Sequence, residues 1–446
     1  MSEQPNILLI LADQHRFDFL PAAMIRRASP APPVRAPNLQ RLALRGAQFT
    51  RVFTPAPLCA PARACLASGR AYHRCGVVNN RQDYPLNQPT FYGLLREAGY
   101  HVAGVGKFDL QKATANHALD GRALLQEWGF SDGIDSKGKW DAVNSWDGHP
   151  HDAYMAYLAC HGLAEMHVAD MSRRRDAHYA CTEPTPLPDH AYGDTWVAGN
   201  GLRLLESFAS DQPWFLQVNF PGPHDPMDVT ESMHDRWEGV DFPPPVDCWA
   251  FDAATHTRIR RNYAAMIENI DGHFGRYLEV LAGRGELDDT LIVYTSDHGE
   301  MLGDHNRWAK SSYYQPSVGV PLIVAGPRVR AGQMLSMPVS LLDLAATFLE
   351  SAGLPIPSDM DSRSLYPLLA GQAADLRPYV VSGLIERAFT WHLIFDGRHK
   401  LVLCDDDAPL LFDLAQDPEE RFDIARAQPE IASRLRALLE RELQTT

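Results

Sequence analysis

Short apolar runs alternate with stretches of helical periodicity along most of this chain, as expected for a sheet covered by helices on both faces. The apolar runs that predict fully buried strands are residues 6–12, 101–105, 214–219, 291–296 and 321–325. Helical patterns occupy residues 38–45, 90–98, about 257–281 and 340–351. We therefore expect an α/β fold, with a large, mostly parallel or mixed sheet sandwiched by helices.

Two segments depart from this alternation. Residues 110–194 have no clean period and are rich in His, Trp, Asp and Gly, so we expect long excursions above the sheet that shape a pocket. Further on, the strand patterns 391–395 and 400–404 flank Asp396-Gly397, a hairpin signal, and a last helix starts near Pro429. The pattern predicts a large domain over residues 1–370 and a small C-terminal α+β subdomain with an antiparallel sheet over 371–446.

The charge of the chain restricts its partners. With 41 Lys and Arg against 56 Asp and Glu, the formal net charge is −15, so the chain repels a phosphate backbone and we expect no nucleic-acid partner. An anionic ligand would require a local cationic pocket.

The chain shows neither a targeting signal nor a cysteine pattern of a disulfide or zinc site. Residues 1–5 lack the basic flank of a signal peptide, and the apolar run 7–12 is too short to span a bilayer, so we expect a cytoplasmic protein without a membrane partner. The seven cysteines have no CxxC spacing, which argues against a disulfide framework and a structural zinc site. The sequence leaves a homo-oligomer open.

Polar residues suited to chemistry follow four of the predicted strands. They are Asp13-Gln14, Lys107, His224 and Asp297-His298. Each alone is also typical of a turn or a helix cap, but ligands of open α/β sheets lie at the carboxyl ends of strands. Asp13, Gln14, Asp297 and His298 together offer a mostly hard donor set that suits Ca²⁺, Mg²⁺ or Mn²⁺, and the imidazole also admits Zn²⁺.

One short segment indicates which residue is the nucleophile. Cys59-Ala60-Pro61-Ala62-Arg63 has the Cys-x-Pro-x-Arg spacing of cysteines that are oxidised to formylglycine. Residues 61–68 predict a short helix that ends at Gly69, with Cys59 just before its N-terminus, where an anion is favoured. An unmodified thiol is the alternative.

These motifs resemble those of the type I, formylglycine-dependent sulfatases of the alkaline phosphatase superfamily. The resemblance runs nearly end to end and is carried by residues 6–14, 59–70, Gly106-Lys107, Pro223-His224, 297–303, Lys310, 320–322 and 411–414 with Asp417-Pro418. It implies a catalytic domain over residues 1–370, a small-molecule sulfate ester as substrate, and a maturation enzyme that converts Cys59 to formylglycine.

The resemblance also implies a role for each site residue. One divalent metal, calcium before magnesium or manganese, is expected to bind Asp13, Gln14, Asp297, His298 and the modified Cys59. The hydrated aldehyde attacks sulfur, and the sulfated hemiacetal that results collapses to release sulfate. Arg63 would hold the diol, Lys107 and Lys310 would balance charge on the sulfuryl group, and His224 would assist the leaving oxygen.

Three departures from the family pattern qualify the resemblance. Ala62 replaces a usual serine in the maturation motif, and Asp109 stands where many sulfatases have histidine, so it is expected either to change diol handling or to face a cationic part of the substrate. Gln14 and His298 replace Asp and Asn, as also occurs among phosphonate and phosphodiester hydrolases.

Two alternatives to a sulfatase therefore remain open. They are a phosphonate monoester or phosphodiester hydrolase that uses the same formylglycine site, and a non-catalytic anion-binding protein with unmodified Cys59. The presence of both Lys107 and Lys310 favours sulfate. Further candidates for contact with the substrate, besides Asp109, are His73, Asn79 and Asn80, which are equally typical of turns.

Overall fold

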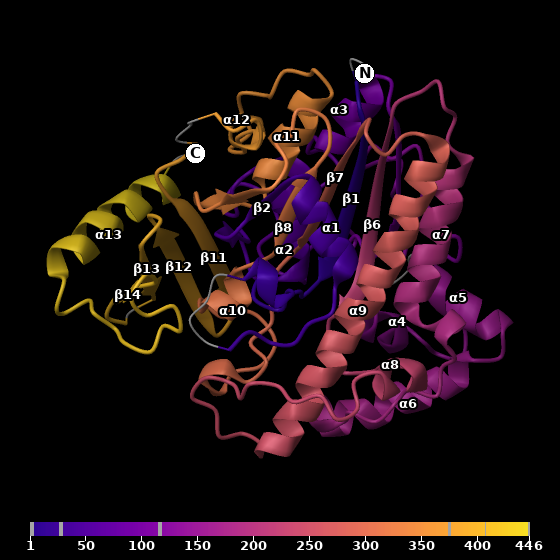
Figure 1. The fold of residues 1–446 in the computed structure, drawn as a ribbon, viewed down its shortest axis with the longest axis horizontal. Helices are drawn as coiled ribbons and strands as arrows, with labels where there is room; N and C mark the ends of the chain where they lie inside the picture. Colours follow the sequence, from indigo (N-terminus) through magenta and orange to yellow (C-terminus); the bar gives the residue numbers. More distant parts are fainter. Residues whose placement is uncertain (1–3, 26–29, 115–117, 373–375, 406, 445–446) are drawn as a thin grey trace.

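The computed structural model describes residues 4–25, 30–114, 118–372, 376–405 and 407–444. Its centre is an eight-stranded mixed sheet of strand order β5-β4-β6-β1-β7-β8-β2-β9 (Figure 1). In that order the strands are Asp132–Asp135, His101–Gly106, Trp214–Pro223, Asn6–Asp13, Thr290–Ser296, Leu322–Ala325, Ala47–Phe49 and Gln333–Leu335. The expected α/β class is confirmed.

The strands that precede the predicted site residues are parallel and adjacent. In register, Ala12 of β1 pairs with Ser296 of β7, and Gly106 of β4 pairs with Asn219 of β6, so these strands end near one edge of the sheet. On the other side of β7, β8 runs antiparallel to both β7 and β2, which makes the sheet mixed.

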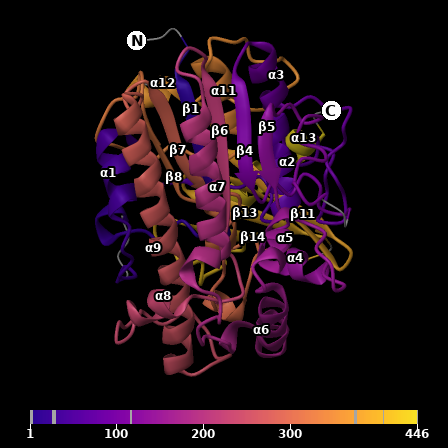
Figure 2. The ribbon, with the colours of Figure 1, turned by 90° about the vertical axis from the view of Figure 1, so that its right-hand side faces the viewer.

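Helices cover both faces of the sheet (Figure 2). On one face, α1 (Pro37–Arg45), α7 (Gly193–Ser207) and α9 (Ala253–Arg284) pack over one large apolar cluster. On the other face, a second cluster contains α2 (Cys59–Ser68), α3 (Phe91–Glu97) and α11 (Asp343–Ser351). Among the described residues, none of the helices combines the length and the apolar character that a bilayer crossing needs.

The sequence predicted most of these helices with small shifts at their ends. Thr90 caps α3 as expected, because its side-chain oxygen accepts a hydrogen bond from Gly93 N at 3.1 Å. The helix expected from residue 340 begins only at Asp343, because Val339–Ser340 forms strand β10, paired with β3 (Val52–Phe53).

The excursions expected over residues 110–194 contain more regular structure than their sequence indicates. They include the edge strand β5 and the helices α4 (Trp140–Asn144), α5 (Ala153–Cys160) and α6 (Ala164–Ala177). Because α4 and α5 are only five and eight residues long, their sequences are too short to show a clear amphipathic period. The expectation of long excursions above the sheet was therefore incomplete, because β5 joins the sheet itself and three helices form within this segment.

The C-terminal part is an antiparallel sheet of order β11-β12-β13-β14, covered by α13 (Pro429–Leu443). The strands are Val380–Glu386, Phe389–Phe395, His399–Cys404 and Leu410–Asp413, and Phe395 pairs with Lys400 across the predicted Asp396-Gly397 turn. The expected antiparallel subdomain is thus confirmed. This sheet shares a buried apolar cluster with Phe53, Leu58 and Val318 of the larger part. Because the two parts pack together in this way, the domain boundary at 370/371 stays a prediction.

The remaining elements are short and serve as connections. They are α8 (Glu231–Asp235), α10 (Gln315–Val318), α12 (Tyr366–Leu369) and the 3₁₀ turns Ala22–Met24, His178–Ala180, Asp189–Ala191 and Asp304–Asn306.

Candidate active site

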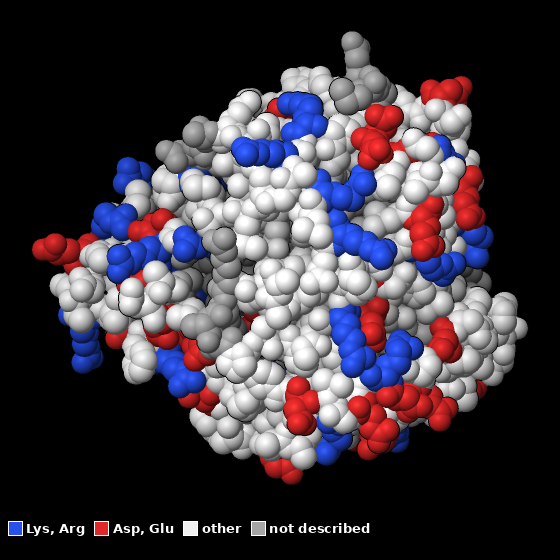
Figure 3. Space-filling view, in the orientation of Figure 1, with Lys and Arg blue, Asp and Glu red and all other residues white. Residues whose placement is uncertain are grey.

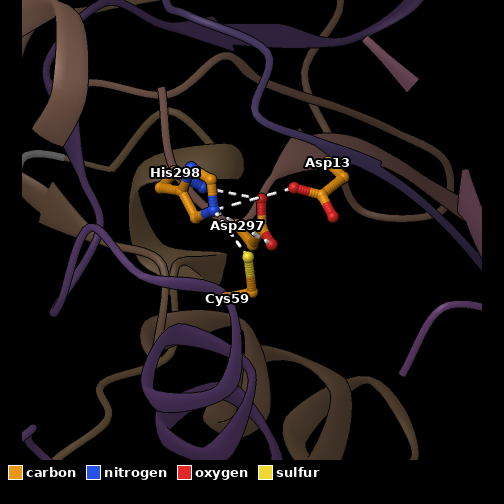
Figure 4. Close-up of side chains that lie close together, drawn as sticks. All are labelled: Asp13, Cys59, Asp297 and His298. Atoms are coloured by element: carbon orange, nitrogen blue, oxygen red, sulfur yellow. Dashed lines mark hydrogen bonds and ion pairs between the residues drawn. The ribbon is translucent and has the colours of Figure 1, made fainter. Parts of the chain in front are cut away.

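Segments that are far apart in the sequence meet where the parallel strands end. Asp13 is the last residue of β1, Asp297 follows β7 directly, and Lys107 follows β4. The helix α2 points its first residue, Cys59, at the same place (Figure 4). The predicted convergence on one edge of the sheet is thus seen in the structure.

Four fully buried side chains form a cluster that suits a metal ion. One ligand atom each of Asp13, Cys59, Asp297 and His298 lies within 4.8 Å of all the others. His298 Nε2 is 3.6 Å from Asp13 Oδ1 and 3.7 Å from Asp297 Oδ2. Asp13 Oδ1 is buried without a hydrogen-bond partner among the described residues, which is costly for a carboxylate oxygen unless a cation binds it. The residues present therefore fit a divalent cation.

Gln14 contributes an amide oxygen beside this cluster. Its Nε2 donates hydrogen bonds to Asp225 Oδ1, at 3.3 Å, and to Glu300 Oε2, so its Oε1 is the atom left to accept a hydrogen bond from Lys310 Nζ at 2.8 Å. Burial raises the pKa of Glu300. Burial also acts to raise the pKa of Asp225, but His224 and Lys310 outweigh it and lower that pKa to about 2.

Cys59 occupies an environment that favours an anion. Its Sγ lies 3.2 Å from His298 Nε2 and 3.2 Å from Lys310 Nζ. Burial acts to raise the pKa of the thiol, yet Lys107, Lys310 and His298 together hold it well below its usual value. If Cys59 is oxidised to formylglycine, Sγ marks the region that the oxygen atoms of that group would take.

Arg63 ties the nucleophile helix to the two carboxylates of the cluster. Its Nε donates to Asp297 Oδ2 at 2.9 Å, its Nη2 lies 3.5 Å from Asp13 Oδ2, and it also donates to the carbonyl of Lys107. Lys107 forms an ion pair with Asp13 and, at 2.9 Å, with Asp109. The negative charge of the buried carboxylates is therefore partly offset before any metal binds.

His224 faces the cluster from the end of β6. Its Nε2 is hydrogen-bonded to Lys310 Nζ, and its Nδ1 lies 2.6 Å from the carbonyl oxygen of Asp225. A ring whose Nδ1 donates to a carbonyl presents Nε2 as the reactive atom. This nitrogen and Lys310 Nζ are thus placed side by side near Cys59.

The cluster opens into a cavity of about 220 Å³. Its lining consists of Asp13, Cys59, Asn80, Lys107, Lys112, Lys137, Lys139, Trp140, Asp141, Pro221, His224 and Lys310. Asn80 was named as a pocket candidate, and it lies here because its Oδ1 accepts a hydrogen bond from Ala60 N, at 3.0 Å, near the start of α2.

The other pocket candidates lie elsewhere. His73 is exposed and lines a separate small cavity beside the C-terminal sheet, together with His392. The side chain of Asn79 accepts a hydrogen bond from Arg81 N at 3.0 Å, as a turn residue does. Asp109 is buried between Lys107 and Lys112, 2.9 and 3.0 Å away. Its charge is therefore matched by protein cations.

Sequence reasoning missed several residues of the cavity, above all Lys112, Lys137, Lys139 and Trp140. All four lie in the segment that lacked clear periodicity. One signal was available in the composition: the chain has only six lysines, and two of them stand together in Lys137-Gly138-Lys139.

A mixed α/β sheet covered by helices, with a buried Asp-Cys-Asp-His cluster and several cations at its strand ends, places the chain in the alkaline phosphatase-like fold class. The family described as Sulfatase matches residues 5–354, and the one described as N-sulphoglucosamine sulphohydrolase, C-terminal, matches residues 303–446. The chain belongs to the sulfatase family and is a sulfuric ester hydrolase.

Relatives of known name agree with this assignment. The chain is 29% identical to the choline-sulfatase of Rhizobium meliloti, over 95% of this chain and 82% of that protein. It is 27% identical to a multifunctional alkaline phosphatase superfamily protein of Trinickia caryophylli, over 94% and 91% of the two chains. Among solved structures, the phosphonate monoester hydrolase of Agrobacterium radiobacter has the same fold, with a TM-score of 0.81, 24% identity, and coverage of 99% of this chain and 96% of that one.

Proposed function

We propose that this protein hydrolyses sulfate monoesters through a formylglycine formed from Cys59, with one divalent cation in the buried cluster. The observation that carries the proposal is the position of Cys59 at the first residue of α2, with Sγ 3.2 Å from both Lys310 Nζ and His298 Nε2. A helix N-terminus with two neighbouring cationic or polar donors stabilises negative charge on a nucleophile and on the group that it attacks.

The cation would be held by Asp13, Gln14, Asp297 and His298 together with the modified Cys59. Carboxylate and amide oxygens favour Ca²⁺, while the imidazole leaves Mg²⁺ or Mn²⁺ as alternatives. When bound, such an ion polarises the sulfuryl oxygens and lowers the pKa of a coordinated hydroxyl. The buried Asp13 Oδ1, which lacks a hydrogen-bond partner among the described residues, supports this assignment.

The residues of the chain then have separate tasks. Formylglycine at position 59, once hydrated, would supply one hydroxyl for attack on sulfur and a second to release sulfate, and water would restore the hydrate. In its doubly protonated form, His224 would give the Nε2 proton to the alcohol oxygen as the bond from that oxygen to sulfur breaks. Lys107 and Lys310 would offset the charge on the sulfuryl group, and Arg63 would hold the diol.

A second candidate activity is the hydrolysis of phosphonate monoesters or phosphodiesters at the same site. It is favoured by Gln14 and His298, which replace the Asp and Asn of many sulfatases, and by the similarity to the multifunctional protein of Trinickia caryophylli. Sulfuryl and phosphoryl transition states share a shape but differ in charge, so one site can accept both.

Two measurements test these proposals. The first is peptide mass spectrometry of the segment that contains Cys59, from protein made with and without a formylglycine-generating enzyme. The second compares kcat/KM for 4-nitrophenyl sulfate and for an aryl phosphonate monoester, with Cys59→Ala as the control. Formylglycine with faster sulfate turnover supports the proposal, whereas unmodified cysteine in an active enzyme overturns the mechanism. The cytoplasmic location stays a prediction from the sequence, which leaves a homo-oligomer open.

A further inference from the structure

The lysines of this chain are concentrated in one cavity. Of the six lysines in the sequence, five line the cavity that contains Cys59: Lys107, Lys112, Lys137, Lys139 and Lys310. The sixth, Lys400 of strand β13, is fully buried in an ion pair with Glu420. The other 35 basic residues are arginines, and Figure 3 shows basic and acidic groups interspersed over one face of the molecule. A chain of net charge −15 thus places its lysines around one small space.

Four of the five lysines in the cavity already have polar partners in the protein. Lys107 pairs with Asp13 and Asp109, and Lys310 contacts Gln14, Cys59 and His224. Lys112 bridges Asp109 and Asp141, and Lys139 Nζ lies 2.7 Å from Asp228 Oδ1. Each of these ammonium groups therefore has part of its charge matched inside the protein.

Lys137 differs from the other four. Its side-chain Nζ makes no hydrogen bond or ion pair with any residue that the structure describes, although the residue is only 7% exposed and lines the cavity. Lysine side chains are seldom buried to this degree, and the Nζ of Lys137 keeps its remaining exposure toward the cavity. An anion in the cavity would supply the missing partner.

The loop that carries Lys137 is held in place from several sides. The backbone N–H of Ser136 donates to the carbonyl of Gly106 at 2.9 Å, and that of Lys137 donates to Asp152 Oδ2 at 3.1 Å. Beyond them, Trp140 Nε1 donates to Asp225 Oδ2 at 2.8 Å. Gly138 has φ +78° and lies so close to Lys107 that a Cβ there would be 2.6 Å from Lys107 Cδ. The loop thus packs against Lys107, and its hydrogen bonds hold Lys137 in place at the cavity before any ligand binds.

We propose that Lys137 binds a second anionic group, a carboxylate or a further sulfate, on the alcohol portion of the substrate. This inference rests on the proposed function, because the sulfate that is cleaved takes the cations around Cys59. The aspartates around the cavity pair with other lysines, whereas Lys137 forms no ion pair with any described residue, so a cationic alcohol beside Lys137 would be repelled. The substrate class is therefore sulfate esters with two anionic groups, in contrast to the cationic choline in the name of the relative from Rhizobium meliloti.

The test compares matched aryl sulfates in the metal-loaded, formylglycine-containing enzyme. The 3- and 4-carboxyphenyl sulfates carry a second anion, the corresponding carbamoylphenyl sulfates are neutral and of similar shape, and benzene-1,3- and 1,4-diol disulfates carry a second sulfate. We expect kcat/KM to favour at least one anionic compound over its neutral partner by about tenfold or more, mainly through KM. The better of the carboxylate and disulfate series identifies the second anion.

Variants assign this preference to one side chain. In Lys137→Met, the preference for the anionic substrates should disappear, while turnover of the neutral carbamoylphenyl sulfates changes little. Lys137→Arg should keep most of the preference, and Arg436→Gln, which removes an exposed charge on α13, should leave it unchanged.

Two outcomes would overturn the proposal. One is equal turnover of charged and neutral compounds by the unaltered enzyme, and the other is a preference that survives in Lys137→Met. Failure to hydrolyse any sulfate ester would instead overturn the proposed function, so the two failures are distinguishable.

Discussion

Lys310 Nζ donates a hydrogen bond to Cys59 Sγ across 3.2 Å, although 251 positions separate the two residues in the chain. The same Nζ contacts Gln14 Oε1 and His224 Nε2. One ammonium group thus contacts the candidate nucleophile Cys59, the candidate metal ligand Gln14 and the candidate acid His224.

Replacing Lys310 should affect the reaction far more than the fold. For Lys310→Met we expect kcat/KM for 4-nitrophenyl sulfate to fall about 100- to 1,000-fold, because a preorganised donor to the developing charge is lost. The midpoint of thermal unfolding, measured by circular dichroism, should change little, since Lys310 is only partly buried. A loss of less than about threefold would remove Lys310 from the catalytic residues.

Removing Arg63 should destabilise the protein as well as inactivate it. Arg63 contacts Asp297 and Asp13, and all three side chains are almost fully buried. Leaving buried carboxylates without this partner should lower the free energy of unfolding of Arg63→Met by about 3–5 kcal/mol, measured by denaturant titration of the metal-free protein. The exposed pair of Arg436 and Glu440 gives the control, for which Arg436→Gln should cost less than about 0.5 kcal/mol. Equal effects of the two variants would contradict the buried ion-pair network.

Metal removal should lower stability through the buried cluster. With Ca²⁺ at about 100 times its Kd, binding to the folded state adds about 2.7 kcal/mol, which a chelator should abolish. In Asp13→Asn, the chelator should have almost no effect on unfolding, and elemental analysis should find less bound metal. Asp141→Asn is the matched control, because Asp141 lines the same cavity outside the ligand cluster. A chelator effect that persists in Asp13→Asn would place the metal elsewhere.

The C-terminal sheet depends on one buried ion pair. Lys400 pairs with Glu420, both fully buried, and donates to the carbonyl of Tyr313 at 2.7 Å. Lys400→Met alone should cost about 3 kcal/mol or more of unfolding free energy, because it leaves a buried charge without its partner. The double variant Lys400→Met with Glu420→Gln should regain much of this loss, since no buried charge remains. Additive losses in a double-mutant cycle would show that the pair does not act as a unit.

His273 should make stability dependent on acid. Burial lowers its pKa to about 4, from an ordinary value of 6.5, and its Nε2 lies 3.2 Å from Thr195 Oγ1. Because the unfolded chain binds this proton more readily, the contribution of neutral His273 is fully present above about pH 6.5. It is lost as pH falls towards 4, by up to about 3 kcal/mol.

The check is the unfolding free energy of His273→Phe between pH 4 and 7. This variant keeps a ring that can stack on Phe220 and should have a flatter pH profile than the unaltered protein. Parallel profiles for the two proteins would show that His273 does not cause the acid sensitivity.

The class of the fold and the centre of the site could be predicted from the amino-acid sequence. The runs of β1 (Asn6–Asp13) and β7 (Thr290–Ser296) are apolar because both strands are buried on both faces, and a buried strand leaves this local mark. The polar residues that end these runs, Asp13 and Asp297, were therefore visible before any contact was known. Cys59 was visible for a different reason, because its motif is contiguous.

The surroundings of that centre became visible only in the folded chain. Asn80 lines the cavity while nearby His73 does not, and Lys137 reaches it from a segment without clear periodicity. The hydrogen bond of Gln14 to Glu300 joins residues 286 positions apart. Such contacts depend on how loops pack across the ends of strands. A local pattern of apolar and polar residues does not show which distant segments will meet there. The charge of the cavity likewise depends on lysines and aspartates from separate segments, which come together only in the folded chain.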